Sequence, residues 1–164
     1  MINNKVKKVK PSYTLTKEEK TSLTYNGITF RSPLEIVTYK ILEQSGLSFQ
    51  YESVDYILQD KFVYPSEIWK EDNSRVFKKT RSTIVQPITH LPDFIVENKF
   101  IIEVKGWQTP DFKLRRKMLL HKLLSEDDAK HYFMPSTIKS VLLSVERIKQ
   151  ILKDGVSQEE TDNN

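Results

Sequence analysis

LPDFIVENKFIIEVKGW, residues 91–107, contains two apolar runs separated by a short polar segment. Runs of this length, rich in isoleucine, valine and phenylalanine, are typical of strands. The segment predicts two strands, Leu91–Val96 and Phe100–Lys105, joined by a loop at residues 97–99. A hairpin of two such strands predicts that this part of the chain forms the centre of the fold.

The register of this hairpin decides which charged side chains meet. With Val96 opposite Phe100, Asp93 falls opposite Glu103, and strand alternation adds Lys105 to the face of Glu103. Facing carboxylates repel each other, and a divalent cation relieves this repulsion, because Mg²⁺ prefers oxygen ligands and commonly takes one or two protein carboxylates. A two-residue loop would instead shift the register and move Glu103 off this face. Glu-x-Lys is also common on exposed strands.

The remainder of the chain predicts helices around the hairpin. Ser32, followed by proline and by Glu35 three residues later, is typical of a helix N-terminus with a capping box. Thr109 and Pro110 predict a second helix, residues 131–134 a short strand, and Ser136 the cap of a final helix. The expected class is α/β, with a small mixed sheet flanked by helices.

Polarity divides the chain into three parts. Residues 1–20 form a basic arm that is expected to be disordered, and residues 154–164 form an acidic tail with the same expectation. Residues 21–153 are expected to form one folded domain. Within it, residues 59–90 mix aromatic and charged side chains and are interpreted as an inserted hairpin or flap.

Composition excludes several classes of protein. The chain has no cysteine, which excludes disulfides, thiolate zinc sites and cysteine nucleophiles. Glycine is scarce and no glycine-rich phosphate loop is present, so no nucleotide cofactor is expected. Without an apolar run of about 20 residues or a signal peptide, the protein is expected to be cytoplasmic, with no membrane association. The three histidines, His90, His121 and His131, are expected to be mainly structural.

A concentrated basic strip accounts for the net charge of +4. Residues 111–122 contain five basic side chains against Asp111 alone. A strip of this kind is expected for a protein that binds the phosphate backbone of DNA, although it is also compatible with a solvated helix face.

Several motifs in order along the chain resemble one nuclease family. Pro92-Asp93, nine further residues and Glu103-Val104-Lys105-Gly106, downstream of a helix with Glu35, resemble the PD-(D/E)xK nuclease superfamily. The match is closest to the phage endonuclease I type, the Holliday-junction resolvases. The segments that carry it are FRSPLE (30–35), GLSFQYE (46–52), residues 91–107 and the basic strip.

This resemblance implies a restriction-endonuclease-like core and roles for individual residues. Asp93 and Glu103 would bind Mg²⁺, for which Mn²⁺ substitutes, together with the backbone carbonyl of Val104. Lys105 would serve the attacking water, and Glu35 would complete the acidic cluster, through a metal-bound water or a second ion. All four of Glu35, Asp93, Glu103 and Lys105 would be catalytic.

The resemblance also implies a partner and a setting. The enzyme would hydrolyse DNA phosphodiester bonds, preferably in branched DNA, as a homodimer in a phage-type recombination or replication role inside a bacterial host. The expected DNA-binding side chains are Lys113, Arg115, Arg116, Lys117, Arg31, Lys78, Lys79 and Arg81. Trp107 has two interpretations, a DNA contact or packing against the neighbouring helix, and packing is favoured.

Two other functions are compatible with the same residues. The same core also serves sequence- or mismatch-directed nicking enzymes of the homing or transposase type, in which residues 59–90 would read DNA. The second alternative is a nuclease-like domain that binds DNA or a partner protein without cleaving DNA. A protein that only binds DNA, however, has no need for carboxylates that repel phosphate.

Overall fold

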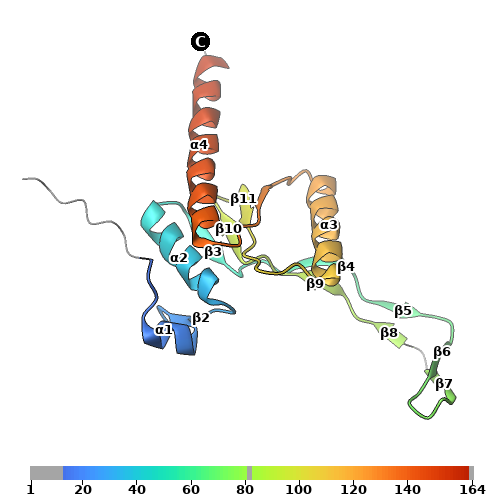
Figure 1. The fold of residues 1–164 in the computed structure, drawn as a ribbon. Helices are drawn as coiled ribbons and strands as arrows, with labels where there is room; N and C mark the ends of the chain where they lie inside the picture. The colour runs from blue at the N-terminus through green and yellow to red at the C-terminus, as the bar shows by residue number, and fades with distance from the viewer. Residues whose placement is uncertain (1–12, 81–82, 163–164) are drawn as a thin grey trace, which may run out of the picture. The chain divides into compact units, whose positions relative to one another are not determined.

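The computed structural model describes residues 13–80 and 83–162, and it divides into two compact units (Figure 1). The first unit comprises residues 1–49 and 134–164, and the second comprises residues 50–133. Helices and small sheets together give the mixed α/β class that the sequence predicts. No helix among the described residues is both long and apolar enough to cross a membrane.

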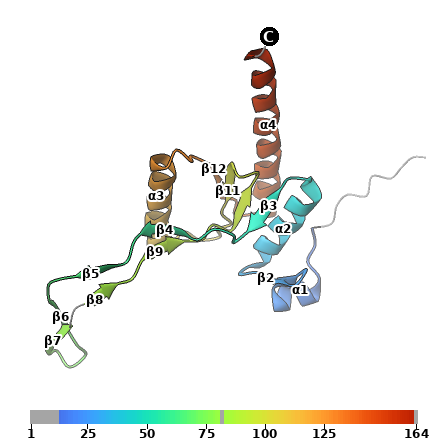
Figure 2. The ribbon, with the colours of Figure 1, turned by 180° about the vertical axis from the view of Figure 1, so that it is seen from behind.

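Two helices form the core of the first unit, α2 (Pro33–Ser45) and α4 (Ile138–Asp162), which pack against each other (Figure 2). Ile36 and Ile41 on α2 and Ile148 on α4 are among the buried side chains. α2 begins at the predicted cap, Ser32, and ends at Gly46, whose φ of 75° suits a residue without a side chain.

A short hairpin precedes α2 in the first unit. Its strands are β1 (Thr24–Tyr25) and β2 (Ile28–Thr29), which pair antiparallel. The turn residues Asn26 and Gly27 both have positive φ, 50° and 77°. Asn-Gly is the residue pair that this turn type favours.

The expected disorder of residues 1–20 is wrong for part of that segment, because it contains most of α1 (Lys17–Ser22). Thr16 caps this helix by accepting from the backbone of Glu19, and the Glu19 carboxylate accepts from the backbone of Thr16 in return. This capping box, together with an ion pair of 2.6 Å between Glu19 and Lys40, stabilises the short helix. Residues 1–12 lie outside the described residues.

The expected disorder after residue 153 is also wrong, because α4 continues to Asp162. No proline interrupts this stretch, and Gln150 donates to Asp154 one turn along the helix, at 2.8 Å. The acidic composition of the tail therefore indicated solvent exposure and did not exclude a helix.

A four-stranded mixed sheet forms the centre of the second unit. Its order is β12 (His131–Phe133), β11 (Phe100–Ile102), β10 (Phe94–Val96) and β3 (Phe49–Tyr51). β10 and β11 are antiparallel, while β11 and β12 are parallel and are connected through a helix. All residues of β10 and β11 are buried, as expected for strands covered on both faces.

The predicted register of the central hairpin is confirmed. Val96 lies opposite Phe100 and Phe94 opposite Ile102. Glu97 and Asn98 in the turn have φ of 49° and 53°, and the turn closes through a hydrogen bond of 3.1 Å from the backbone N–H of Lys99 to the carbonyl of Val96. The strands are shorter than predicted, because residues 91–93 and 103–105 continue the chain without regular strand pairing.

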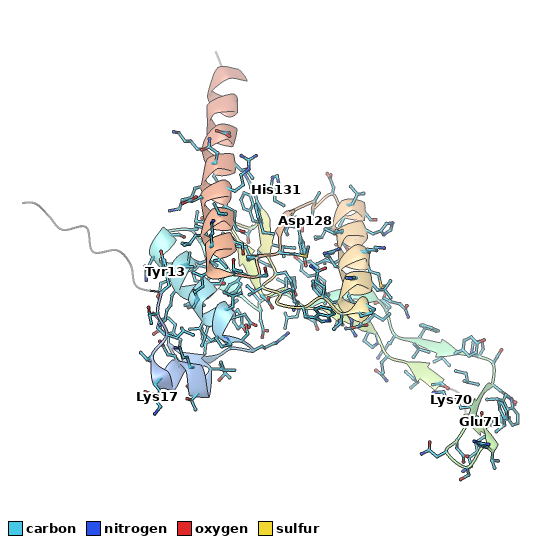
Figure 3. The ribbon with its side chains drawn as sticks, viewed as in Figure 1. Tyr13, Lys17, Lys70, Glu71, Asp128 and His131 are labelled. Atoms are coloured by element: carbon cyan, nitrogen blue, oxygen red, sulfur yellow. The ribbon has the colours of Figure 1, made fainter. Side chains whose placement is uncertain are left out.

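Residues 59–90 form part of a long hairpin, in agreement with the prediction of an inserted hairpin or flap. Three antiparallel pairs of strands make up this hairpin: β4 (Tyr56–Gln59) with β9 (Ile88–His90), β5 (Phe62–Tyr64) with β8 (Thr83–Val85), and β6 (Ile68–Glu71) with β7 (Phe77–Thr80). Lys70 and Glu71 mark its outer part (Figure 3). We call residues 60–86 the arm; its large apolar side chains, Phe62, Val63, Trp69, Phe77 and Ile84 among them, are exposed.

One helix, α3 (Pro110–Ser125), covers the inner end of this hairpin and one part of the sheet. Leu119 and Leu123 pack with Ile101 of β11, and Tyr56 of β4 lies beside them. The helix starts with the predicted Thr109-Pro110 pair, in which the threonine side chain accepts from the first turn of the helix. The exposed positions of α3 include the basic Lys113 and Lys117 and also three leucines, Leu114, Leu120 and Leu124.

Leu119→Ala should destabilise the protein by about 2–5 kcal/mol, because the side chain is fully buried and its removal leaves a cavity. Leu124→Ala on the same helix is the matched control. Its side chain is 70% exposed, so the free energy of unfolding should change by about 0.5 kcal/mol or less. Urea unfolding of the two variants measures the difference; equal costs would contradict this packing of α3.

Candidate functional site

Asp93 connects three segments of the second unit. It lies immediately before β10 and is 1% exposed. Its carboxylate Oδ2 accepts a hydrogen bond of 2.7 Å from the backbone N–H of Val104, and its backbone carbonyl accepts one of 2.9 Å from Glu52. The side chain is therefore fixed in position by the backbone of the neighbouring strand.

Glu52, directly after β3, was not predicted as a site residue. It is held in the left-handed region with φ of 44°, a conformation that costs a residue other than glycine some free energy and that often occurs at functional sites. One carboxylate oxygen of Glu52 lies within 4.8 Å of one of Asp93. Two carboxylates this close are chemically suited to share a divalent cation, so these acidic residues could hold a metal ion.

Glu103 lies one residue beyond β11, and its backbone N–H donates to the carbonyl of Phe133 at 2.9 Å. The side chain is 1% exposed, and the Lys105 ammonium is 3.0 Å from its Oε1. Burial raises the pKa of Glu103, but the interaction with His90 and the charge of Lys105 outweigh burial and hold the pKa below its usual value. The carboxylate is therefore ionised at neutral pH.

Two further side chains surround Glu103, and neither was predicted as part of the site. His90, at the end of β9, is buried with its Nε2 3.5 Å from Glu103 Oε2, a long distance for a hydrogen bond. Tyr132 on β12 has a buried hydroxyl group, and burial and the charge of Glu103 raise its pKa. Among the described residues, neither His90 Nε2, Glu103 Oε2 nor the Tyr132 hydroxyl has a hydrogen-bond partner. Buried polar atoms of this kind indicate a place for a ligand.

The predicted grouping of Asp93, Glu103 and Lys105 is only partly reproduced. Lys105 contacts Glu103 as predicted. However, the carboxylate that lies within metal-ligand spacing of Asp93 is that of Glu52. Among the described residues, Glu103 is not part of such a group. The reason is that Asp93 is fixed by Val104 while Glu103 turns towards Lys105 and His90. The sequence feature that could have pointed to Glu52 is its position as the acidic last residue of the predicted strand 48–52.

Glu35 lies in the first unit, in the first turn of α2, and is 4% exposed. Its Oε1 accepts from the Ser32 hydroxyl at 2.7 Å, and its Oε2 accepts from the backbone N–H of Arg31 at 3.1 Å. Glu35 therefore stabilises the start of the helix, which is the structural role that the capping-box motif predicts.

The predicted DNA-binding side chains of α3 differ in their availability. Lys113 and Lys117 are exposed. Arg115 donates to the backbone carbonyl of Thr89 at 2.8 Å and pairs with the acid one turn earlier, so it also fixes the helix on β9. Arg116 lies over the ring of Phe112, 5.9 Å from its centroid.

The other predicted DNA contacts lie elsewhere in the chain. Lys78 and Lys79 on the arm form ion pairs with Asp72 and Glu67 of the same hairpin, which reduces the positive charge available to a phosphate. Arg31 is exposed before α2 in the first unit. Arg81 lies outside the described residues.

The favoured interpretation of Trp107, packing against the neighbouring helix, is wrong. Its side chain is 83% exposed in the segment between β11 and α3. The inward face of α3 is already filled by Phe112, Leu119 and Leu123, so the helix offers the tryptophan no apolar surface there.

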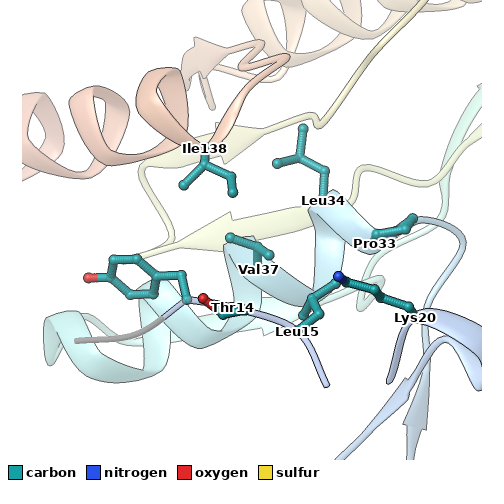
Figure 4. Close-up of a pocket in the computed structure, with 8 residues that line it drawn as sticks. Thr14, Leu15, Lys20, Pro33, Leu34, Val37 and Ile138 are labelled. Carbon is teal, nitrogen blue, oxygen red and sulfur yellow. The ribbon is translucent and has the colours of Figure 1, made fainter. Parts of the chain in front are cut away.

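A separate pocket of about 470 Å³ lies in the first unit (Figure 4). The side chains around it are Tyr13, Thr14, Leu15, Lys20, Pro33, Leu34, Val37 and Ile138. This lining is mostly apolar and contains no acid or histidine, so it offers no carboxylate or imidazole ligand for a metal ion. The chemistry-bearing side chains are those around Asp93 and Glu103.

Fold and site together define a mixed α/β protein with buried acids and a lysine at the end of a central strand pair. Residues 15–134 match the family described as protein of unknown function (DUF1064), and the chain belongs to this family. Neither the curated proteins nor the solved structures contain a significant match. The matched region includes Glu35, Glu52, Asp93, Glu103 and Lys105.

Divalent cations should stabilise the protein if the acids around Asp93 bind them. At about 100 times the dissociation constant, Mg²⁺ or Mn²⁺ should raise the melting temperature by roughly 5–10 °C, and EDTA should reverse the change. Glu52→Gln and Asp93→Asn keep the side-chain shape and an acceptor, and both should abolish the increase. Asp60→Asn removes an exposed acid and should keep it; an increase that survives in both site variants would place the ion elsewhere.

Proposed function

We propose that this protein is a metal-dependent endodeoxyribonuclease. The observation that carries the proposal is the ion pair between the buried Glu103 and the partly exposed Lys105. It lies beside Asp93, whose carboxylate accepts from the backbone N–H of Val104, the residue between those two. An acid that can bind a cation next to a lysine that can meet a phosphate is suited to phosphodiester hydrolysis. A purely structural ion pair does not need further buried acids nearby, because they add electrostatic repulsion.

Asp93 and Glu103 would hold the cation, together with the backbone carbonyl of Val104, and Glu52 adds a further carboxylate. Mg²⁺ is the proposed ion, with Mn²⁺ as a substitute, and it would polarise the scissile phosphate. The Lys105 ammonium, 3.0 Å from Glu103, would orient the attacking water and stabilise negative charge that develops on the phosphate. His90 would restrain Glu103 from the other side.

Glu35 is proposed as another member of the acidic set, on the basis of the family resemblance. Both of its carboxylate oxygens already accept hydrogen bonds at the start of α2, from Ser32 and Arg31. An oxygen has more than one lone pair, so these bonds leave room for a water or an ion. Glu35→Gln should keep the helix cap and reduce cleavage.

DNA is the proposed substrate because the basic side chains of α3 adjoin Lys105 in sequence and include the exposed Lys113 and Lys117. Branched DNA, such as a Holliday junction, is the preferred form on the basis of the resemblance. Resolving a junction needs two cuts, so a homodimer in a phage-type recombination or replication role inside a bacterial host is part of the proposal.

Purified protein should nick a four-way junction or supercoiled DNA with Mg²⁺ or Mn²⁺ and should not do so in EDTA. Glu103→Gln and Lys105→Ala should each lower the rate about 100-fold or more, because the first weakens the hold on the cation and the second removes a positive charge that would act on the reacting phosphate. Lys149→Ala removes an exposed lysine of α4 and should cleave at the normal rate. Normal cleavage by both site variants would refute the assignment, and metal-independent DNA binding without cleavage would indicate a binding domain.

A second candidate function keeps this chemistry and changes the target. The arm is a two-stranded antiparallel ribbon with exposed side chains on both faces, and ribbons of this kind fit the major groove of DNA. This feature favours a sequence- or mismatch-directed nicking enzyme. A cleavage panel of junction, mismatched and linear DNA distinguishes the two, because preference for a sequence over a shape would support the second.

A further inference from the structure

Trp107 is the most exposed of the large hydrophobic side chains that the structure describes, at 83%. A tryptophan offers a large flat ring whose burial contributes strongly to binding, so exposed tryptophans are enriched where proteins meet partners. The inward face of α3, where the ring could have packed, is filled by Phe112, Leu119 and Leu123.

The ring is attached close to the proposed active site. Trp107 follows Lys105 by two residues, so their Cα atoms are at most about 7.6 Å apart. Lys105 is itself anchored to Glu103 at 3.0 Å. A ligand group that binds the Trp107 ring therefore lies close to the ligand group that contacts the Lys105 ammonium.

The charge around Trp107 indicates a polyanion. Residues 105–122 contain six basic side chains and one acid. Arg116 reaches back from α3 to the loop, where its Nη1 is 3.5 Å from the side-chain oxygen of Gln108, the residue after Trp107. A protein partner with an apolar surface would not need this excess of positive charge, whereas phosphates would be attracted by it.

An exposed aromatic ring among cations is the combination that binds unpaired nucleotides. The cations hold the backbone phosphates while a base stacks on the ring. Bases inside a continuous duplex are already stacked on their neighbours and cannot reach such a ring without being unstacked. The surface therefore discriminates in favour of DNA whose bases are free.

We propose that Trp107 is a stacking surface for an unpaired nucleotide of DNA, next to the phosphate that meets Lys105. The proposal rests on the proposed function and refines it: the preferred substrate has an unstacked base beside the cleavage position. Branch points, splayed ends and mismatches all supply such bases, whereas uninterrupted duplex does not.

The chain has two tryptophans, so Trp69→Phe leaves Trp107 as the sole tryptophan and gives it a fluorescence signal of its own. In this background, with EDTA to prevent cleavage, a short oligothymidylate should quench the emission, and a duplex of equal length should quench it much less.

Trp107→Phe retains a ring and should bind the oligothymidylate nearly as tightly. Trp107→Leu should weaken binding by about 5- to 150-fold, the range for loss of one stacked base, and leave duplex affinity unchanged; fluorescence anisotropy of labelled DNA measures both.

Leu124→Ala in the same background is the matched control, since it removes an exposed apolar side chain of the same unit that has no ring; its affinity should not change. Absence of quenching, or equal oligothymidylate affinity in Trp107→Leu, would overturn the inference, as would an equal loss for duplex. These titrations use no metal and no cleavage. If the titrations fail while Mg²⁺-dependent nicking is present, the stacking proposal is wrong and the proposed function stands. If they succeed while the Glu103 and Lys105 variants still cleave, the site assignment is wrong and the stacking proposal stands.

Discussion

The register of β10 against β11 is the constraint on which the second unit depends. The turn at Glu97 and Asn98 sets it, with two residues at positive φ and Val96 opposite Phe100. A slip by one residue would turn the buried side chains of a strand towards the opposite face. It would also break the hydrogen bond between Asp93 and the backbone of Val104, because that bond needs these two residues side by side at the end of the ladder.

The burial of two carboxylates at this end of the sheet destabilises the folded protein unless other groups compensate their charge. Asp93 and Glu103 are almost completely buried, and a buried carboxylate costs several kcal/mol unless it is paired or hydrogen-bonded. The backbone N–H of Val104 at Asp93 and the Lys105 ammonium at Glu103 offset part of that cost. The protein thus holds concentrated negative charge in a rigid frame, which is the preorganisation that cation binding and charge stabilisation need.

The hairpin could be predicted from sequence because its determinants are local: two apolar runs, a three-residue loop and the alternation of strands. The contact between Lys105 and Glu103 follows from the same alternation. The acid at the end of the predicted strand 48–52 was not enough to assign Glu52 to the site, because its proximity to Asp93 depends on pairing between distant segments and on a left-handed backbone at a glutamate. Trp107 was predicted to pack because apolar rings usually do, yet the available helix face was already filled. α1 was not predicted because the lysine-rich composition of residues 1–20 is typical of disorder, although Thr16 and Glu19 form a capping box.

The two turns of the second unit tolerate change very differently. The arm ends in side chains that contact mainly one another and water, so insertions, deletions and new sequences there leave the core intact. The turn at residues 97–99 connects two fully buried strands and sets the position of Asp93, so a single inserted residue there would cost both folding and chemistry. A change in the length of the short turn therefore affects the protein far more than a change of the same size in the arm.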